Sequence, residues 1–155
     1  MITNNDILRR IRYTFNFNDS KMIELFALAN SDVTRAQVSD WLKKEDDTSF
    51  VSIEDIDLAI FLNGLINDKR GRKDGAQPLP EKRLNNNIIF RKLKIALDLK
   101  DDDVLEILGL CDMRISKHEL SAFFRHPDQS QYRPCNDQML RVFLQGLQKK
   151  YKPLG

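Results

Sequence analysis

Two cysteines and two histidines are the side chains whose types could bind a metal ion. Cys111, His118, His126 and Cys135 all lie in the second half of the chain and have the donor atoms of a Cys2His2 zinc site. Their spacing, C-x6-H-x7-H-x8-C, lacks the short pair of ligands that is typical of structural zinc sites. We therefore predict no metal site, and nothing else in the sequence indicates a cofactor.

Basic side chains form the second group with recognisable chemistry, because Lys and Arg attract phosphate. Residues 68–100 carry 10 Lys or Arg against 4 Asp or Glu, although the whole chain has a formal net charge of only +2. If the protein binds DNA or RNA, we expect six residues to contact it: Arg70, Arg72, Lys73, Arg91, Lys94 and Arg125. The competing interpretation is a solvated connector, and it is favoured because residues 71–84 contain no aromatic side chain that could stack on a base.

Motifs for catalysis do not occur in the sequence. It contains no G-x-S-x-G, Walker A or G-x-G-x-x-G pattern, and no segment places a nucleophile and a base together at helical spacing. We therefore predict that the protein has no catalytic residues and is not an enzyme.

An internal duplication organises the chain. Shifting the sequence by 82 positions aligns residues 5–69 with residues 87–151 without a gap, and 14 positions are identical. The alignment places Cys111 and Cys135 opposite Ala29 and Ile53. Because the other copy has apolar residues at these positions, we predict that both cysteines are free thiols packed in the core.

Hydrophobic spacing predicts four helices in each copy and no strand, so the fold class is all-α, with two tandem four-helix repeats. Asp19 and Asp101 precede the second helix of each copy as predicted N-caps. The third helix begins with a capping box, Thr34-x-x-Gln37 in one copy and Ser116-x-x-Glu119 in the other. Trp41 and Phe123 follow on the same helix at equivalent positions, and both are predicted core aromatics.

Two identities between the copies suggest tertiary contacts. Gly64 and Gly146 interrupt the apolar stripe of the fourth helix, where glycine costs about 1 kcal/mol relative to alanine, so a close helix approach is expected. Either the two fourth helices cross at these glycines about a pseudo-twofold axis, or glycine is tolerated within each repeat. Arg9 and Glu24, repeated as Arg91 and Glu106, are predicted to form a salt bridge between the first two helices.

Residues 33–42 are similar to the second helix of helix-turn-helix DNA-binding proteins, with Val38 and Trp41 as inward anchors. Leu28 and Asp32 stand where that motif has a small residue and a turn glycine. Residues 32–51 carry three basic and five acidic side chains, whereas residues 114–133 carry four basic and two acidic ones. Only the second copy therefore has a charge that suits phosphate.

Several segments together resemble the YehS-like proteins across nearly the whole chain. They are Asn4-Asn5-Asp6-Ile7-Leu8-Arg9, Trp41-Leu42-Lys43-Lys44-Glu45, Phe61-Leu62-Asn63-Gly64-Leu65-Ile66, Lys69-Arg70-Gly71, Asn85-Asn86-Asn87-Ile88, and the segment from Asp137 to Leu147. The resemblance implies a bacterial protein built from two copies of a domain of unknown function. It carries over no activity, cofactor or catalytic residue.

The domain organisation that follows is a first helical repeat at 1–70, a basic linker at 71–84 and a second repeat at 85–155. The polar residues after Met1 argue against a signal peptide. No apolar run comes near the length that a membrane-spanning helix needs, which is about 18 residues. The cytoplasm is the expected compartment. We expect a non-enzymatic interaction or regulatory module with a protein partner, with nucleic-acid binding as the alternative and homodimer formation left open.

Overall fold

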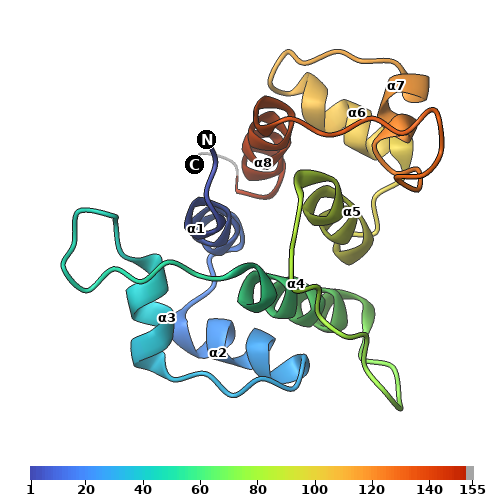
Figure 1. The fold of residues 1–155 in the computed structure, drawn as a ribbon. Helices are drawn as coiled ribbons and strands as arrows, with labels where there is room; N and C mark the ends of the chain where they lie inside the picture. The colour runs from blue at the N-terminus through green and yellow to red at the C-terminus, as the bar shows by residue number, and fades with distance from the viewer. Residues whose placement is uncertain (153–155) are drawn as a thin grey trace.

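The computed structural model describes residues 1–152, which form eight α-helices and no β-strand (Figure 1). The helices are α1 (Asn4–Phe15), α2 (Asp19–Leu28), α3 (Arg35–Leu42), α4 (Asp55–Arg70), α5 (Asn86–Ala96), α6 (Asp101–Gly109), α7 (Lys117–Ala122) and α8 (Asp137–Tyr151). Adding 82 to the bounds of α1 to α4 gives those of α5 to α8 to within two residues. The prediction of an all-α fold with two tandem four-helix repeats is therefore confirmed.

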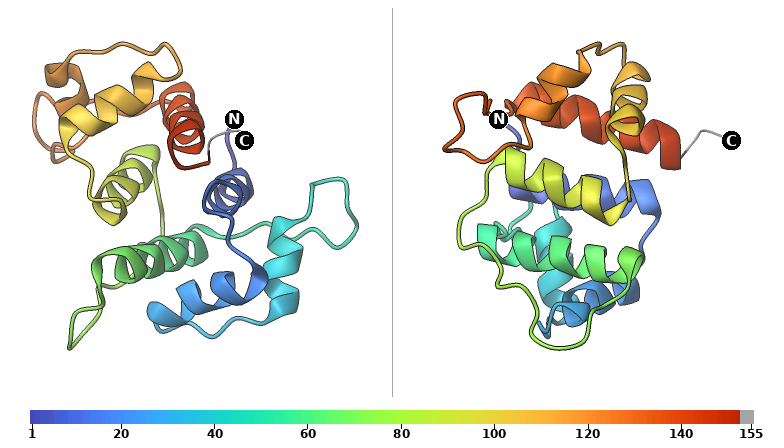
Figure 2. Two further views of the ribbon diagram at one scale, coloured as in Figure 1. Left: turned by 180° about the vertical axis from the view of Figure 1, so that it is seen from behind. Right: turned by 90° about the vertical axis from the view of Figure 1, so that its right-hand side faces the viewer.

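The first helix of each repeat packs on the last helix of the other repeat. Helices α1, α4, α5 and α8 lie together in the centre, with α2 and α3 on one side and α6 and α7 on the other (Figures 1 and 2). Within this central group α1 packs mainly on α8, and α5 packs mainly on α4, so each first helix rests on the last helix of the other repeat. The arrangement is reciprocal under the 82-residue offset and therefore has a pseudo-twofold axis.

Gly64 and Gly146, which occupy the same position in the two repeats, each allow a close helix contact inside their own repeat. A Cβ on Gly64 would overlap the carbonyl oxygen of Leu25 in α2, and one on Gly146 would overlap the carbonyl oxygen of Ile107 in α6. Of the two alternatives, the crossing of the two fourth helices at these glycines is thus wrong. A helix approach is indeed close there, but the helix that comes close is the second helix of the same repeat.

Helix starts follow the predicted capping chemistry in α3 and α7 and depart from it in α2. Both capping boxes form, with the Thr34 and Ser116 hydroxyls accepting the amides of Gln37 and Glu119. The N-cap of α2 is Asn18, one residue before the predicted Asp19, and its side chain accepts the Lys21 amide at 2.8 Å. Asp19 instead occupies the first turn, where the helix dipole stabilises a carboxylate.

The start of α6 differs in the same way. Lys100 occupies the N-cap position, and its amide donates to a carboxylate oxygen of Asp103 at 2.8 Å. The predicted cap, Asp101, is the first residue of the helix. The prediction of Asp19 and Asp101 as N-caps is therefore wrong by one residue. The Asn18 side chain accepts the Lys21 amide at the start of α2, and the Asp103 side chain accepts the Lys100 amide at the start of α6.

Burial matches the predicted core with one exception. Val38, Trp41 and Phe123 are buried, and so is Cys135. Cys111 is only half-buried, although it packs against the core. The prediction of two core cysteines is therefore confirmed for Cys135, whereas Cys111 lies at the edge of the core.

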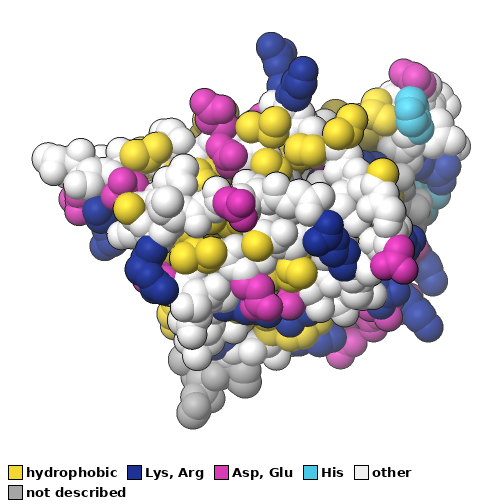
Figure 3. Space-filling view, turned by 90° about the horizontal axis from the view of Figure 1, so that it is seen from below, with side chains coloured by type: hydrophobic (Ala, Val, Ile, Leu, Met, Phe, Trp, Pro, Cys, Tyr) yellow, Lys and Arg dark blue, Asp and Glu magenta, His cyan; other side chains and the backbone are white. Residues whose placement is uncertain are grey.

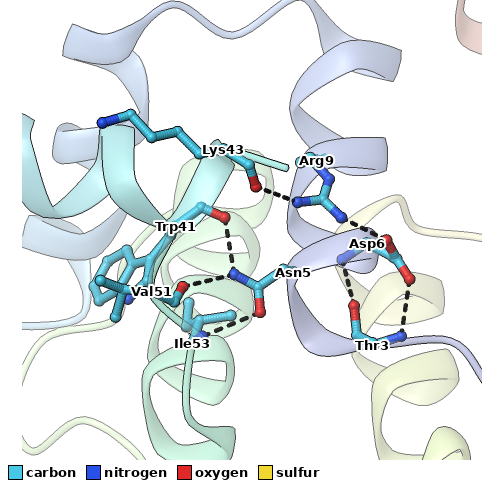
Figure 4. A network of polar contacts seen from close by, with 8 residues as sticks. All are labelled: Thr3, Asn5, Asp6, Arg9, Trp41, Lys43, Val51 and Ile53. Carbon is cyan, nitrogen blue, oxygen red and sulfur yellow. Dashed lines mark hydrogen bonds and ion pairs between the residues drawn. The ribbon is translucent and has the colours of Figure 1, made fainter. Parts of the chain in front are cut away.

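Arg9 and Glu24 do not form the predicted salt bridge. The Arg9 guanidinium pairs with Asp6 one turn earlier in α1, at 2.5 Å, and donates to the carbonyl oxygen of Lys43 at 2.7 Å (Figure 4). Glu24 pairs with Lys21 on its own helix at 3.1 Å. Arg9 and Glu24 each pair with a residue of their own helix, because α1 packs mainly on α3, α4 and α8 rather than on α2.

A buried asparagine in each repeat fixes the loop that follows the third helix. The Asn5 amide donates to the carbonyl oxygens of Trp41 and Val51, and its oxygen accepts the Ile53 amide, at 2.8, 2.9 and 3.1 Å (Figure 4). Asn87 makes the three equivalent bonds, to Phe123, Arg133 and Cys135. Each side chain thereby satisfies backbone groups that neither helix nor strand would pair.

The carboxylates of Asp55 and Asp137 connect the two repeats. Asp55 accepts from the Asn4 side chain at 2.7 Å and from the backbone amide of Leu84 at 2.8 Å. Asp137 accepts from Asn86 at 2.8 Å and from the amide of Ile2 at 3.3 Å. These two carboxylates are thus the points where each repeat holds the chain just before the first helix of the other.

Candidate functional site

Three of the six residues predicted for nucleic-acid binding lie together. Arg70, Arg91 and Lys94 line a shallow concavity of about 420 Å³ beside the C-terminal half of α5, with Asp98 and Phe124 among its other lining residues. We call it the α5 concavity. An aromatic ring within a basic surface is the combination that single-stranded nucleic acids bind.

Carboxylates pair with two of these three cations. Arg70 forms a salt bridge to Asp98 at 2.9 Å, and Lys94 forms one to Asp101 at 2.9 Å. The Lys94 ammonium also lies 4.7 Å from the centre of the Phe124 ring. Only Arg91 has no salt bridge to a residue in the described range 1–152, so the α5 concavity has little net positive charge to offer a phosphate.

The other three predicted residues lie outside this concavity. Arg72 donates to the side-chain oxygen of Asn30 at 2.6 Å, at the end of α2. Lys73 is exposed in the linker, and Arg125 is half-buried in the loop after α7. The structure therefore does not bring the six predicted residues into one surface.

The face that contains α3 carries both signs of charge. Val38 and Trp41 of the helix-turn-helix-like segment point inward, as predicted. Figure 3 shows this face, on which basic and acidic side chains alternate and hydrophobic side chains lie in small separate patches. It has no field of a single sign that would attract a nucleic acid.

A larger concavity lies between α1 and α8, and we call it the α1/α8 groove. Its volume is about 800 Å³, within the range of about 300–1,000 Å³ that is usual for ligand sites. It is lined by Ile2, Asp6, Arg9, Arg10, Tyr13, Cys111, Asp112, Arg141, Leu144, Gln145, Gln148 and Lys149. Apart from Cys111, which was weighed above as a zinc ligand, the sequence singled out none of these residues for binding.

Four cations and two carboxylates give the α1/α8 groove an excess of positive charge. Arg9 and Asp6 neutralise each other across one helical turn. Burial opposes the ionisation of Asp6, but hydrogen bonds from Thr3 and Arg9 outweigh it and lower the pKa of the carboxyl group. The Arg10 side chain makes no hydrogen bond or salt bridge with any residue of 1–152, so its guanidinium lines the groove unpaired.

The equivalent groove on the other side of the pseudo-twofold axis is filled by the linker. Beside α4, where α2 ends, only about 50 Å³ of concavity remains, and Gln77 and Pro78 of the linker form part of its wall. Glu81 of the linker contacts Lys92 of α5. The other residues that line the concavity are Ala29, Asn63, Ile66 and Asn67. Adding 82 to these numbers gives Cys111, Gln145, Gln148 and Lys149, all of which line the α1/α8 groove.

Polar contacts hold the linker in the α4/α5 groove. The buried ammonium of Lys92 donates to the side-chain oxygen of Asn63 at 2.6 Å and forms an ion pair with Glu81 at 3.0 Å. Asn67 donates to the Leu28 carbonyl oxygen at 2.8 Å and to the Gln77 side chain at 3.1 Å. Part of the linker, interpreted above as a solvated connector, is thus a bound segment.

The candidate zinc ligands do not come together. Across residues 1–152 no three His, Cys, Asp or Glu side chains form a group that could hold a metal ion. His118 and His126 are exposed, whereas Cys135 is buried. Burial raises the pKa of the Cys135 thiol to about 12, so this side chain is protonated at neutral pH.

One sequence signal could have revealed the polar contacts between helices and loops. Asn4 and Asn5 recur as Asn86 and Asn87 at the 82-residue offset, at positions where the helical pattern does not require asparagine. No sequence signal indicates the α1/α8 groove. It stands out only because it is open while the linker covers the equivalent groove of the other repeat.

Comparison with known proteins defines the family. The family described as "Protein of unknown function (DUF1456)" matches residues 4–71 and again residues 86–152. The chain belongs to this family. It is also 47% identical over 144 residues to the "Uncharacterized protein YehS" of Escherichia coli strain K12, and the match covers 92% of each chain. The resemblance to the YehS-like proteins is thereby confirmed.

The match to both repeats agrees with the helix correspondence, so each repeat of this chain is one copy of the family's domain. No solved structure matches the chain. Among the described helices, none combines the length and the apolar character that crossing a membrane requires.

Proposed function

We propose that the protein is a non-enzymatic interaction module that binds an extended segment of a partner protein in the α1/α8 groove. One observation supports this above all: the equivalent groove between α4 and α5 already holds an extended segment, residues 77–81 of the chain itself. The two grooves are built from equivalent positions of two homologous repeats. A surface that holds a peptide segment in one repeat is suited to hold one in the other.

The lining of the α1/α8 groove also favours a protein ligand over a reaction. Its only thiol, Cys111, is half-buried, and neither His118 nor His126 lines the groove. Activation of a thiol by a general base usually uses a neighbouring histidine. Arg10, Tyr13 and Gln145 instead offer a charge, a ring and an amide, which are typical groups for peptide recognition.

Nucleic-acid binding has weaker support. The strongest argument for it is that Arg70, Arg91 and Lys94 share the α5 concavity with Phe124. Two of these three cations are already paired with carboxylates, and the remaining predicted residues lie elsewhere. The observations therefore favour a protein partner.

A photo-crosslinking experiment tests the proposal with a control supplied by the duplication. Tyr13 lines the α1/α8 groove, and Ile95 is its equivalent in the second repeat; their exposed fractions are 48% and 46%. A photoreactive phenylalanine analogue would replace each in turn, in cells that express the full chain. We expect Tyr13 to give a crosslink to a partner that mass spectrometry identifies, and Ile95 to give none to that partner.

Charge inversion then shows whether the groove carries the interaction. The variant Arg10→Glu should abolish the crosslink from position 13 and the binding of the purified partner. Arg114→Glu is the matched control, because Arg114 is an exposed arginine outside the groove, and it should leave both unchanged.

Three results would contradict the proposal. Equal crosslinking from positions 13 and 95 would show that the groove is not the binding surface, and so would binding that survives Arg10→Glu. A crosslink between two copies of the chain, with a dimer that dissociates in Arg10→Glu by light scattering, would replace the partner protein by a second copy.

A further inference from the structure

The linker shows which chemical groups a bound segment presents to this type of groove. Glu81 places a carboxylate on Lys92, and Gln77, four residues earlier, places an acceptor oxygen on Asn67. Pro78 and Pro80 lie between them, and residues 76–81 form no helix or strand. Proline fixes φ and restricts the residue before it to extended conformations, so the segment spans the two contacts in an extended form.

The 82-residue offset identifies the receiving side chains in the α1/α8 groove. Lys92 corresponds to Arg10, Asn63 to Gln145 and Asn67 to Lys149. The correspondence extends to a backbone contact: Asn67 donates to the carbonyl oxygen of Leu28, and Lys149 donates to the equivalent carbonyl oxygen, that of Leu110, at 3.1 Å. Lys149 therefore occupies the position of Asn67 and retains two further N–H groups for a ligand.

The residues at these positions make the α1/α8 groove more suited to acidic side chains than the α4/α5 groove is. Arg10 replaces an ammonium by a guanidinium, whose planar fork binds a carboxylate through two hydrogen bonds. Lys149 replaces a neutral amide by a cation, so a carboxylate suits this position better than the amide of Gln77. Arg141 adds a third cation where the other repeat has Ala59, and the exposed Asp112 is the one carboxylate of the groove without a salt bridge inside residues 1–152.

We propose that the segment bound in the α1/α8 groove is extended and carries two acidic side chains four residues apart, the first facing Lys149 and the second facing Arg10. This inference rests on the proposed function, because it describes the ligand of the same groove. It specifies the chemistry of the partner: an acidic, proline-compatible stretch that adopts no helix.

A peptide derived from the linker tests the inference directly. The probe is Gly75–Glu81 with Gln77→Glu, capped at both ends, which has the sequence Gly-Ala-Glu-Pro-Leu-Pro-Glu. It would be added to the isotope-labelled full chain up to about 2 mM, a range that detects Kd values near 1 mM, at about 50 mM salt to limit screening. We expect saturable NMR shift changes at Arg10, Gln145 and Lys149.

Changes in the peptide measure the contribution of each acid. Replacing either glutamate by glutamine should weaken binding about two- to fivefold, as expected for a partly exposed charge pair. Deleting the leucine, which brings the acids three residues apart, should weaken it by a similar factor. The variant Arg10→Glu should lose the original peptide and bind one whose last glutamate is arginine.

The results separate this inference from the proposed function. A peptide with two glutamines that binds the α1/α8 groove as tightly as the probe would overturn the acidic pattern and leave the groove as a peptide site. Shift changes confined to α4 and α5, or none at about 2 mM, would also overturn the inference. Whether the groove binds a partner is decided independently by the crosslink from position 13.

Discussion

Replacement of Gly64 by alanine tests the packing of α4 on α2. An added Cβ would overlap the Leu25 carbonyl oxygen and lie 2.6 Å from its carbonyl carbon, and both atoms belong to backbone that cannot rotate away. The overlap with the oxygen is so large that the two helices must separate by more than about 1 Å to reach an allowed contact. A separation of that size forfeits about half or more of the dispersion attraction between the facing atoms. Overpacking of this kind costs about 1–3 kcal/mol or more, and breaking the contact along a whole helix lies at the upper end.

The net effect includes the helix propensity of alanine, which favours the folded state by about 1 kcal/mol relative to glycine. We therefore expect Gly64→Ala to lower the free energy of unfolding by about 2–3 kcal/mol and the melting temperature by about 5–10 °C for a chain of this length. Gly146→Ala should act in the same direction, because its Cβ would overlap the Ile107 carbonyl oxygen and lie 2.6 Å from the Ile107 Cγ2 methyl group.

Gly109 provides the matched control for this measurement. It is the last residue of α6, and a Cβ there would have no atom within 4 Å. Gly109→Ala should be neutral or stabilising by up to about 1 kcal/mol. Urea and thermal unfolding followed by circular dichroism would give the three values. The reasoning is refuted if Gly64→Ala is as stable as Gly109→Ala.

Three further predictions concern ionisable groups. The hydrogen bond from Asn86 is the main reason why the pKa of Asp137 lies below its usual value of 3.8, so its stabilisation is present at neutral pH and is lost as the pH falls below about 4. Melting curves at pH 7 and about pH 3 should therefore differ less for Asp137→Asn than for the wild type, and an equal difference would contradict this. Because burial raises the pKa of Cys135 to about 12, iodoacetamide at about pH 8 should alkylate Cys111 first and Cys135 only on unfolding, as mass spectrometry can establish. Early labelling of Cys135 in a Cys111→Ser variant would show that this thiol is not buried. Finally, we expect no saturable binding of duplex DNA at about 50 mM salt, as measured by fluorescence anisotropy, because carboxylates pair with two cations of the α5 concavity. Binding that disappears when the three cations of the α5 concavity are changed to alanine would favour the nucleic-acid function instead.

Local patterns predicted the helices and their order. The apolar spacing and the capping boxes depend on residues within one or two turns, so they identify a helix without knowledge of its neighbours. Gly71 likewise acts locally, because it ends α4 with a φ of +88°, which glycine adopts readily. The offset of 82 then extended each assignment to the second repeat.

Pairings between helices were harder to predict, because several partners compete for the same group. Gly64 indicates a close approach, but a glycine does not specify which helix comes close. Arg9 had a carboxylate three residues away on its own helix, and this local partner replaced the predicted distant one. The roles of Asp55 and Asp137 depend on the path of the chain before each first helix, which periodicity does not describe.

The candidate site depended on the path of the linker. Its polar composition favoured a solvated connector, yet Glu81 and Gln77 each contact a side chain of the α4/α5 groove. The α1/α8 groove becomes apparent only when the two sides of the pseudo-twofold axis are compared. Only three of the six predicted cations share one concavity. The other three lie elsewhere, because residues that are close in sequence at the junction do not all point to one face.

The reciprocal packing of the repeats makes the two grooves unequal once the copies share one chain. A symmetric dimer of single repeats packed in this way would present two equal grooves. Joining the copies requires a connection from the end of α4 to the start of α5, and this connection runs along one groove. One of the two equivalent grooves is therefore covered by the chain itself, and the partner binding that we propose would be monovalent where the dimer would be bivalent.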